Sequence, residues 1–224
     1  MTIRKINLEA DRERVAKLYQ FENEAHSEGY KLIAGVDEAG RGSLIGSVII
    51  GAVILPPNLY LERLDDSKKL SPEIREKLYY EIIYNAVSVS CVSVSVEEID
   101  NLNVYQATAQ GMIKAVNCLP VKPDFVLVDA VKVEFGKIPA RAIIKGDALS
   151  ANIAAASIVA KVTRDRLADD WSKIFPQYGF DKNRGYGTKE HLAAIEKFGF
   201  TPLHRKTFEP LKSTLQKSVQ LSLF

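Results

Sequence analysis

Four acidic residues stand where predicted secondary-structure elements begin or end. Asp37 and Glu38 follow one apolar run, and Asp129 follows a second. Asp147 lies in a turn that precedes an alanine-rich segment. Strand ends gather at one edge of an α/β sheet, where converging carboxylates can hold two Mg²⁺ or Mn²⁺ ions about 4 Å apart for phosphoryl transfer. The spacing therefore suggests a metal site built from these four acids.

Each acid also has a simpler interpretation. Asp147 could cap the helix that follows it, because aspartate is a favoured N-cap residue. Asp129 could be a turn aspartate, and Asp37 with Glu38 could be a solvated pair in a loop. The spacing alone leaves these alternatives open.

Periodicity and capping residues predict the elements that would position the acids. Residues 8–27 are charge-rich with apolar residues at helical spacing, which indicates an amphipathic helix ahead of the core. The β-branched runs 33–36 and 47–55 flank a glycine-rich turn and are expected to pair as neighbours. Ser71 is an N-cap candidate for a helix that runs to about Asn85.

Strands and helices then alternate along the chain. Residues 87–96 alternate valine with serine, but the phase changes at Cys91 and Val92, which suggests a β-bulge. Asn103 can cap a helix to about residue 117. Two short strands and a long helix are expected at residues 125–128, 141–144 and 150–171. The pattern predicts an α/β fold in one domain, with a mixed central sheet flanked by helices.

Composition limits the class of protein. Hydrophobic residues make up 46% of the 224 residues, which favours a packed core over disorder. The net charge of +2 does not by itself indicate a nucleic-acid partner, so such a partner must be argued locally. Cys91 and Cys118 lack metal-ligand spacing, and no apolar stretch reaches membrane-spanning length. We expect reduced thiols and a soluble, cytoplasmic protein.

Five motifs occur in order along the chain: VDEAGRG at 36–42, DSKKL at 66–70, KGD at 145–147, SIVAKVTRD at 157–165 and GYGT at 185–188. Together they make the sequence resemble the ribonuclease HII family from about Leu32 to Pro210. The resemblance implies a ribonuclease H-like fold with a helical C-terminal region. Within the single catalytic domain 1–224 we expect an N-terminal helical extension, a core and a C-terminal tail, at residues 1–30, 31–210 and 211–224.

The resemblance also implies an activity and the residues that carry it. The expected reaction is metal-dependent hydrolysis of the phosphodiester 5′ to a ribonucleotide, in RNA/DNA hybrids and in duplex DNA with embedded ribonucleotides. It leaves 3′-hydroxyl and 5′-phosphate ends. The family's catalytic and metal-binding acids fall on Asp37, Glu38, Asp129 and Asp147.

The family's substrate readers fall on the turn Gly40, Arg41 and Gly42 and on Tyr186. A turn built on two glycines lets backbone groups approach the sugar edge. A 2′-hydroxyl can both donate and accept a hydrogen bond there, which deoxyribose cannot do. Without the resemblance, Arg41 would read as a surface charge and Tyr186 as a packing aromatic.

Other basic and polar residues are expected substrate contacts. The loop Ser67, Lys68 and Lys69 suits a phosphate, although a solvated charge run is the alternative. Lys161 and Arg164 lie one helical turn apart and could contact the substrate backbone, or could pair with nearby aspartates instead.

The histidines carry weaker expectations. His26 and His191 are expected to be surface residues on helices, because hard cations prefer oxygen ligands. The cluster of His204, Arg205 and Lys206 has no assigned role.

Other functions remain to be weighed. A ribonuclease HIII would carry a sizeable extra N-terminal domain, whereas only about 30 residues precede the first core strand here. A non-catalytic binder of hybrid duplexes would not need four clustered acids, which repel phosphate without a metal. A small-molecule phosphatase would leave the glycine-rich turn and Tyr186 unexplained. We expect a monomer.

Overall fold

A five-stranded mixed sheet forms the centre of the computed structural model, which describes residues 6–215. The strand order is β3-β2-β1-β4-β5. Strand β1 pairs antiparallel with β2 and parallel with β4, while β2–β3 is antiparallel and β4–β5 parallel. The strands are β1 Ile33–Ala39, β2 Val48–Ile54, β3 Ser88–Val94, β4 Phe125–Asp129 and β5 Ala140–Ile143. The α/β prediction with a mixed sheet is confirmed.

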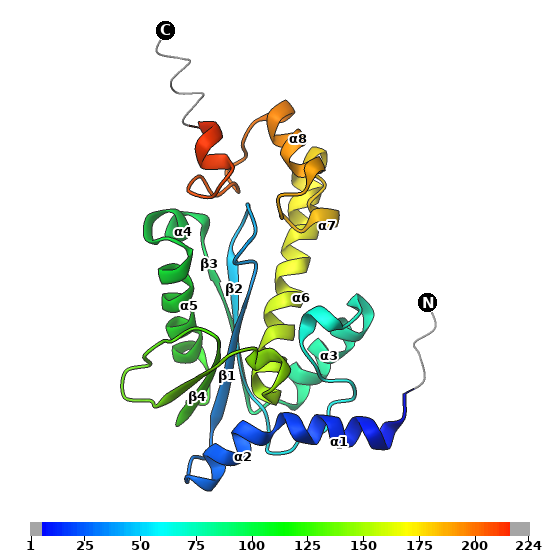
Figure 1. The fold of residues 1–224 in the computed structure, drawn as a ribbon, viewed down its shortest axis with the longest axis vertical. Coiled ribbons are helices and arrows are strands. Elements are labelled where there is room, and N and C mark those ends of the chain that lie inside the picture. The colour runs from blue at the N-terminus through cyan, green and yellow to red at the C-terminus, as the bar shows by residue number, and fades with distance from the viewer. Residues whose placement is uncertain (1–5, 216–224) are drawn as a thin grey trace.

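Helices cover both faces of the sheet. Figure 1 shows α5 on one side and α3 with α6 on the other. The helices are α1 Leu8–Leu18, α2 Gln20–Ser27, α3 Pro72–Asn85, α4 Val96–Leu102, α5 Val104–Cys118, α6 Ala151–Ile174, α7 Phe180–Asn183 and α8 Lys189–Phe198. Short 3₁₀ helices are η1 Ser67–Lys69, η2 Gly146–Ala148 and η3 Pro176–Tyr178. This coverage explains why β1 and β2 are almost continuously apolar and buried.

The long helix α6 lies directly against the central strand. A Cβ placed on Gly35 of β1 would lie 2.1 Å from the Asn152 carbonyl carbon at the start of α6. Only glycine permits this approach of two backbones. The contact fixes the position of α6 and of the turn that precedes it, where Asp147 lies.

Two of the predicted capping residues are confirmed. The Ser71 hydroxyl accepts a hydrogen bond from the Ile74 N–H at the start of α3. The Asn103 side chain accepts from two N–H groups of the first turn of α5. The antiparallel pairing of β1 with β2 is confirmed as well, although β1 extends to Ala39 rather than ending at residue 36.

Three local predictions are wrong or incomplete. Residues 8–27 form two helices, because the Tyr19 N–H bonds back to Ala16 and interrupts the α-helical ladder. Strand β3 has no bulge and pairs with β2 in continuous register. Valines occur in both phases because both faces of β3 are covered: Val89 packs toward α3 and α6, and Val94 toward α5. Helix α4 was not predicted, although its Ser95-x-x-Glu98 capping box could have revealed it.

The two ends of the described chain pack on the core. Tyr19 is buried in the cluster that contains α3 and α6, and its hydroxyl donates to the Leu59 carbonyl. Leu211 is buried and begins a helical stretch over residues 211–215, while the rest of the expected tail lies outside the described residues. Within residues 6–215, no helix has the length and apolar character needed to cross a bilayer.

Candidate active site

Three aspartates converge at the carboxyl edge of β1 and β4. The parallel register pairs Val36 with Val128, so Asp37 and Asp129 follow each other on neighbouring strands. Asp147 joins them from η2. One carboxylate oxygen from each of the three lies within 4.8 Å of the others. The sequence prediction that these segments deliver acids to one place is therefore confirmed in its geometry.

Local hydrogen bonds hold Asp147 in this position. The Gly146 N–H donates to Asp129 Oδ1 at 2.7 Å, which ties η2 to the end of β4. Ser150, not Asp147, caps α6, because the Ser150 hydroxyl accepts from the Ile153 N–H. The Asp147 carboxylate instead accepts from Lys68 Nζ at 2.8 Å. The capping interpretation of Asp147 is therefore wrong.

Glu38, the fourth predicted acid, borders the cluster without being one of the three converging groups. Its Oε1 forms an ion pair with Arg41 Nη1 at 2.9 Å. Its Oε2 is buried and has no hydrogen-bond donor in the described part of the protein. An unsatisfied buried carboxylate oxygen is costly, and a cation beside it would remove that cost.

Burial and mutual repulsion disfavour the charged state of these acids. Burial raises the pKa of Asp37 well above its usual value, and the charges of Glu38, Asp129 and Asp147 raise it further. Burial also raises the pKa of Glu38, against the lowering effect of Arg41. Burial likewise raises the pKa of Asp129, although the Gly146 N–H opposes the shift. A divalent cation with oxygen ligands would relieve this repulsion, so the donor set fits Mg²⁺ or Mn²⁺.

An open pocket of about 450 Å³ lies beside the acids. Most of the predicted substrate contacts line it. The lining comprises Asp37, Glu38, Ala39, Gly40, Arg41, Gly42, Ser67, Lys68, Asp129, Lys161, Arg164, Asp165, Arg184 and Tyr186. Lys69 is not among them, because its ammonium pairs with Asp65 at 2.9 Å. Cationic and anionic side chains thus share the pocket, as a phosphate next to a metal site requires.

The glycine-arginine-glycine turn and Tyr186 meet at one wall of this pocket. Gly40 has φ +90°, and a Cβ there would lie 2.7 Å from Arg164 Nε, so the position requires glycine. A Cβ on Gly42 would lie 3.8 Å from Cε1 of the Tyr186 ring. The Leu44 N–H donates to the Gly185 carbonyl at 2.9 Å, which joins the two loops.

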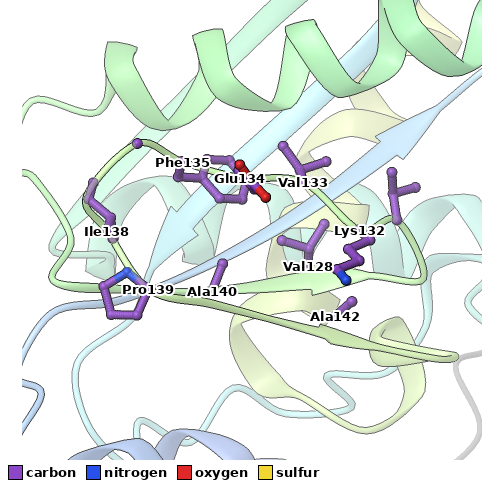
Figure 2. Close-up of a pocket in the computed structure, with 11 residues that line it drawn as sticks. Val128, Lys132, Val133, Glu134, Phe135, Ile138, Pro139, Ala140 and Ala142 are labelled. Carbon is purple, nitrogen blue, oxygen red and sulfur yellow. The ribbon is translucent and has the colours of Figure 1, made fainter.

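Another pocket, of about 390 Å³, lies between β4, β5 and the loop 130–139. Figure 2 shows Val128, Ala140 and Ala142 from the strands facing loop residues such as Phe135 and Ile138. Its lining is mainly apolar and includes a single acid, Glu134. Because it offers no converging carboxylates, it is not the candidate active site.

Comparisons with known proteins agree with the geometry. The family model described as ribonuclease HII matches residues 34–211. The chain belongs to the ribonuclease HII family. It is accordingly a metal-dependent endoribonuclease of the ribonuclease H type.

Individual relatives support the family assignment. The chain is 50% identical to the ribonuclease HII of Geobacillus kaustophilus over 209 residues, which is 93% of this chain and 80% of that protein. It is 49% identical to the ribonuclease HII of Enterococcus faecalis over 199 residues, or 89% of this chain and 78% of that one. The crystal structure of the ribonuclease H2 from Pyrococcus horikoshii superposes with a TM-score of 0.71 at 30% identity, covering 84% of this chain and 98% of that one.

Two of the predicted substrate contacts in this ribonuclease HII have other partners. Lys161 forms an ion pair with Asp165 at 2.6 Å, as the alternative interpretation held, and it also borders the pocket. Arg164 is only 2% exposed and donates from Nη2 to the Ser43 hydroxyl and the Ile45 carbonyl. Its guanidinium also lies 4.5 Å from the Trp171 ring centroid. Arg164 therefore supports the loop after the glycine-rich turn, and it also lines the pocket.

The C-terminal basic cluster contains residues whose position the sequence did not predict. Arg205 and His204 are buried, and Arg205 donates to backbone carbonyls of the glycine-rich turn. His191 is fully buried, so the prediction of a surface histidine is wrong. It packs beside Tyr178, Phe180 and His204 and contacts the Tyr186 carbonyl through Nδ1. Histidine and arginine are usually exposed, and only the tertiary structure shows the partners that permit their burial here.

Proposed function

We propose that this ribonuclease HII hydrolyses the phosphodiester on the 5′ side of a ribonucleotide, both in RNA/DNA hybrids and in duplex DNA that contains embedded ribonucleotides. The products would carry 3′-hydroxyl and 5′-phosphate ends. The observation that carries the proposal is the adjacency of two features: Asp37 and Asp129 of the carboxylate cluster line the same pocket as the glycine-rich turn and Tyr186.

In this proposal Asp37, Asp129 and Asp147, with Glu38 beside them, hold two Mg²⁺ or Mn²⁺ ions. When bound, such cations would supply Lewis-acid chemistry that can activate a water and stabilise a leaving 3′ oxygen. The residues of the chain fix where that chemistry happens: Gly146 orients Asp129, and the parallel pairing of β1 with β4 aligns Asp37 with it. Arg41 holds one oxygen of Glu38, and no group within residues 6–215 donates a hydrogen bond to the other.

The basic residues of the pocket position the phosphate. Lys68 bridges η1 to Asp147, and its side chain is 73% exposed. Lys161 lines the same pocket with its ammonium on Asp165. Ser67 lines the pocket but is buried, so it shapes the loop that presents Lys68. Because these cations are only partly neutralised by neighbouring acids, they can exchange a carboxylate partner for a phosphate oxygen.

The glycine-rich turn recognises the ribose. Within residues 6–215, the N–H groups of Arg41 and Gly42 have no hydrogen-bond acceptor, and the turn borders the pocket. Backbone donors that glycine leaves uncovered can bond a 2′-hydroxyl, which accepts as well as donates. Tyr186 is 46% exposed beside Gly42 and offers a face on which the next sugar can stack. This arrangement favours the junction between a ribonucleotide and DNA.

The test is cleavage of end-labelled duplex DNA that carries one ribonucleotide, with Mg²⁺, with Mn²⁺ and with chelator, beside an all-DNA duplex of the same sequence. The proposal requires metal-dependent nicking 5′ to the ribonucleotide and none of the all-DNA control. Binding without cutting would indicate a non-catalytic hybrid binder. Cutting at other positions would refute the assignment of the turn as a ribose reader.

The cellular setting follows as part of the same proposal. Such a reaction serves ribonucleotide removal from DNA and the processing of RNA primers. Cys91 and Cys118 are free thiols, which agrees with the cytoplasm as the compartment. We propose a monomeric, single-domain enzyme, which sedimentation at assay concentration would test.

A further inference from the structure

The guanidinium of Arg205 lies beneath the glycine-rich turn and bonds three of the carbonyls around it. Nη2 donates to the Gly40 carbonyl at 2.8 Å, and Nη1 to the Arg41 carbonyl at 2.9 Å. Nε donates to the Gly46 carbonyl at 2.9 Å. The residue is fully buried. One side chain therefore fixes the direction of the peptide planes at both ends of the segment 40–46.

No carboxylate lies within ion-pair distance of Arg205 anywhere in residues 6–215, so backbone carbonyls accept its hydrogen bonds, with the Phe208 ring 5.0 Å from the guanidinium and the charge of Asp100 acting from farther away. Burial, with a smaller contribution from the cation of Arg164, lowers the pKa of Arg205 to about 9, and the residue remains charged at neutral pH. A buried cation without a counter-ion is costly unless its donors are satisfied. The planar fork of arginine meets that demand only if the turn keeps this conformation.

The residue before Arg205 begins a second connection, which ends at Tyr186. The Thr201 N–H donates to His204 Nδ1 at 2.9 Å, which places the His204 proton on Nε2. His204 Nε2 lies 3.3 Å from His191 Nε2 and donates to it. The remaining proton of His191 is then on Nδ1, which donates to the Tyr186 carbonyl at 2.9 Å. The hydrogen bonds thus define two neutral imidazoles with fixed tautomers.

Both connections start from the same short stretch of chain. Figure 1 shows the C-terminal segment, in orange and red, at the end of the sheet where β1 turns into β2. Residues 201–205, here called the supporting segment, contact the glycine-rich turn directly through Arg205 and reach the Tyr186 loop through His191. Those loops lie about 145 residues apart in sequence and share no secondary-structure element.

We propose that Arg205 and the His204–His191 pair are positioning residues that determine the selectivity of this enzyme for ribose. Arg205 orients the peptide planes of the glycine-rich turn. The histidine pair fixes the position of the Tyr186 backbone relative to that turn. Neither touches the substrate. The proposal rests on the proposed function, because it assumes that the turn and Tyr186 read the ribonucleotide.

The decisive measurement is a ratio of two affinities. Duplex DNA with one ribonucleotide and the matching all-DNA duplex are titrated into the full chain by fluorescence anisotropy, in an Asp129→Asn background that prevents cleavage. The Kd for the all-DNA duplex divided by the Kd for the ribonucleotide duplex reports the selectivity for ribose. A loss of folded protein changes the number of binding sites but leaves this ratio unchanged, so a merely structural role would not move it.

Arg205→Lys keeps the charge but replaces the three donor nitrogens Nε, Nη1 and Nη2 of the planar fork by one nitrogen, which cannot occupy all three positions. We expect the Kd ratio to fall at least about five-fold, since one or two charged hydrogen bonds to the turn are lost. Lys206→Ala is the matched control: it removes the neighbouring exposed cation, and its ratio should equal that of the parent. An unchanged ratio in Arg205→Lys, which includes the case where both duplexes bind equally more weakly, overturns the role of Arg205.

His204→Asn tests the second connection independently. The Asn carbonyl can still accept from the Thr201 N–H, while the donor to His191 is lost. We expect a fall of about two- to three-fold in the ratio, because a neutral hydrogen bond is weaker than a charged one. If Arg205→Lys fails to fold, this variant decides, and an unchanged ratio refutes the proposal.

A wrong assignment of the ribose reader and a wrong assignment of its supports give different results in this experiment. If the parent protein shows no preference for the ribonucleotide duplex, the proposed reader is wrong and the supporting segment has nothing to position. If the parent shows the preference and the variants keep it, the reader stands and the supporting role is refuted.

Discussion

The carboxylate cluster and the ribose-reading surface meet at one pocket, which Asp37 and Asp129 of the cluster line, but the two are built in opposite ways. The cluster lies on the central sheet and in η2, where strand register and one backbone hydrogen bond bring the acids together. The reading surface consists of two loops, held by buried arginines and histidines that come from other parts of the chain. The cluster stores electrostatic repulsion, whereas Arg205, His204 and His191 have hydrogen-bond partners, and among the described residues only Arg164 of these supports keeps buried nitrogens, Nε and Nη1, without one.

This contrast separates catalysis from recognition in stability terms. Acids that repel one another disfavour the folded protein until a cation arrives, and such sites commonly trade stability for function. Residues that hold a loop by fully formed hydrogen bonds add stability and rigidity instead. Substitutions in the two regions should therefore change activity and stability in different combinations.

The largest expected effect is on turnover through the cluster. Asp129→Asn preserves side-chain size and the acceptor for the Gly146 N–H, but it removes a charge from the metal site. We expect kcat on the single-ribonucleotide duplex to fall by about 10³-fold or more, with an unchanged far-ultraviolet spectrum. Rates within ten-fold of the parent would show that the cluster is not the catalytic centre.

The next effect is a loss of folding stability at acid pH, and it arises from His204 among the supports. Burial, together with His191, lowers the pKa of His204 to about 4, from an ordinary value of 6.5. The unfolded chain therefore binds a proton more readily than the folded one between these values, and stability is lost as the pH falls from about 6.5 to about 4. At about 1.4 kcal/mol per pH unit, the loss from this group reaches about 3 kcal/mol.

Denaturant unfolding of the metal-free protein at several pH values measures this loss. His204→Asn removes the titrating group, so the variant should be less stable at pH 7 but should show a flatter decline into acid. A variant whose stability falls as steeply as that of the parent would mean that other groups control acid unfolding. In that case the supports would not differ from the cluster in how their stability depends on pH.

A smaller effect should distinguish recognition from general packing. Tyr186→Ala removes the ring beside Gly42 while leaving the backbone carbonyl that His191 contacts. We expect kcat/KM on a duplex with one ribonucleotide to fall about ten-fold, and less on a hybrid whose whole strand is RNA, because the ring stacks at the junction. Equal losses on the two substrates would assign Tyr186 to packing alone.

How much the sequence could predict follows the same division. The acids were predictable because each ends or begins an element that periodicity and capping residues locate, and because five motifs carry the family resemblance. Ser71 and Asn103 were identifiable for the same local reason. In contrast, the change of phase in β3 was read as a bulge because its second covered face is a tertiary property.

The supports were not predictable, since burial of a charged or titratable residue depends on partners far away in sequence. Arg164 bonds Ser43 and Ile45 over about 120 residues, and Arg205 bonds Gly40 over 165. Sequence alone places arginine and histidine at the surface by default. The clustering of His204 with Arg205 was visible, but nothing local indicated that both point inward.

The smallest expected effect concerns the cluster, where stability should depend on pH in the opposite direction from that expected for His204. Burial raises the pKa of Asp37 well above its usual value of 3.8, so this group disfavours the metal-free fold fully at pH values above the raised pKa, and the penalty shrinks as the pH falls from there toward 3.8. Asp37→Asn keeps an oxygen that can accept from the Glu38 N–H and removes the charge. We expect the variant to melt about 3–6 °C higher than the parent at pH 8 without metal, and the gain to shrink at pH 5.

Added Mg²⁺ provides the control for this last comparison. The cation should raise the Tm of the parent at pH 8 and have little effect on Asp37→Asn, because only the parent offers the full set of carboxylates to bind it. Thermal unfolding with and without Mg²⁺ measures both differences. If Asp37→Asn instead melts lower than the metal-free parent, the carboxylate of Asp37 stabilises the fold. The contrast between a repulsive cluster and the hydrogen-bonded supports of the reading surface is then wrong.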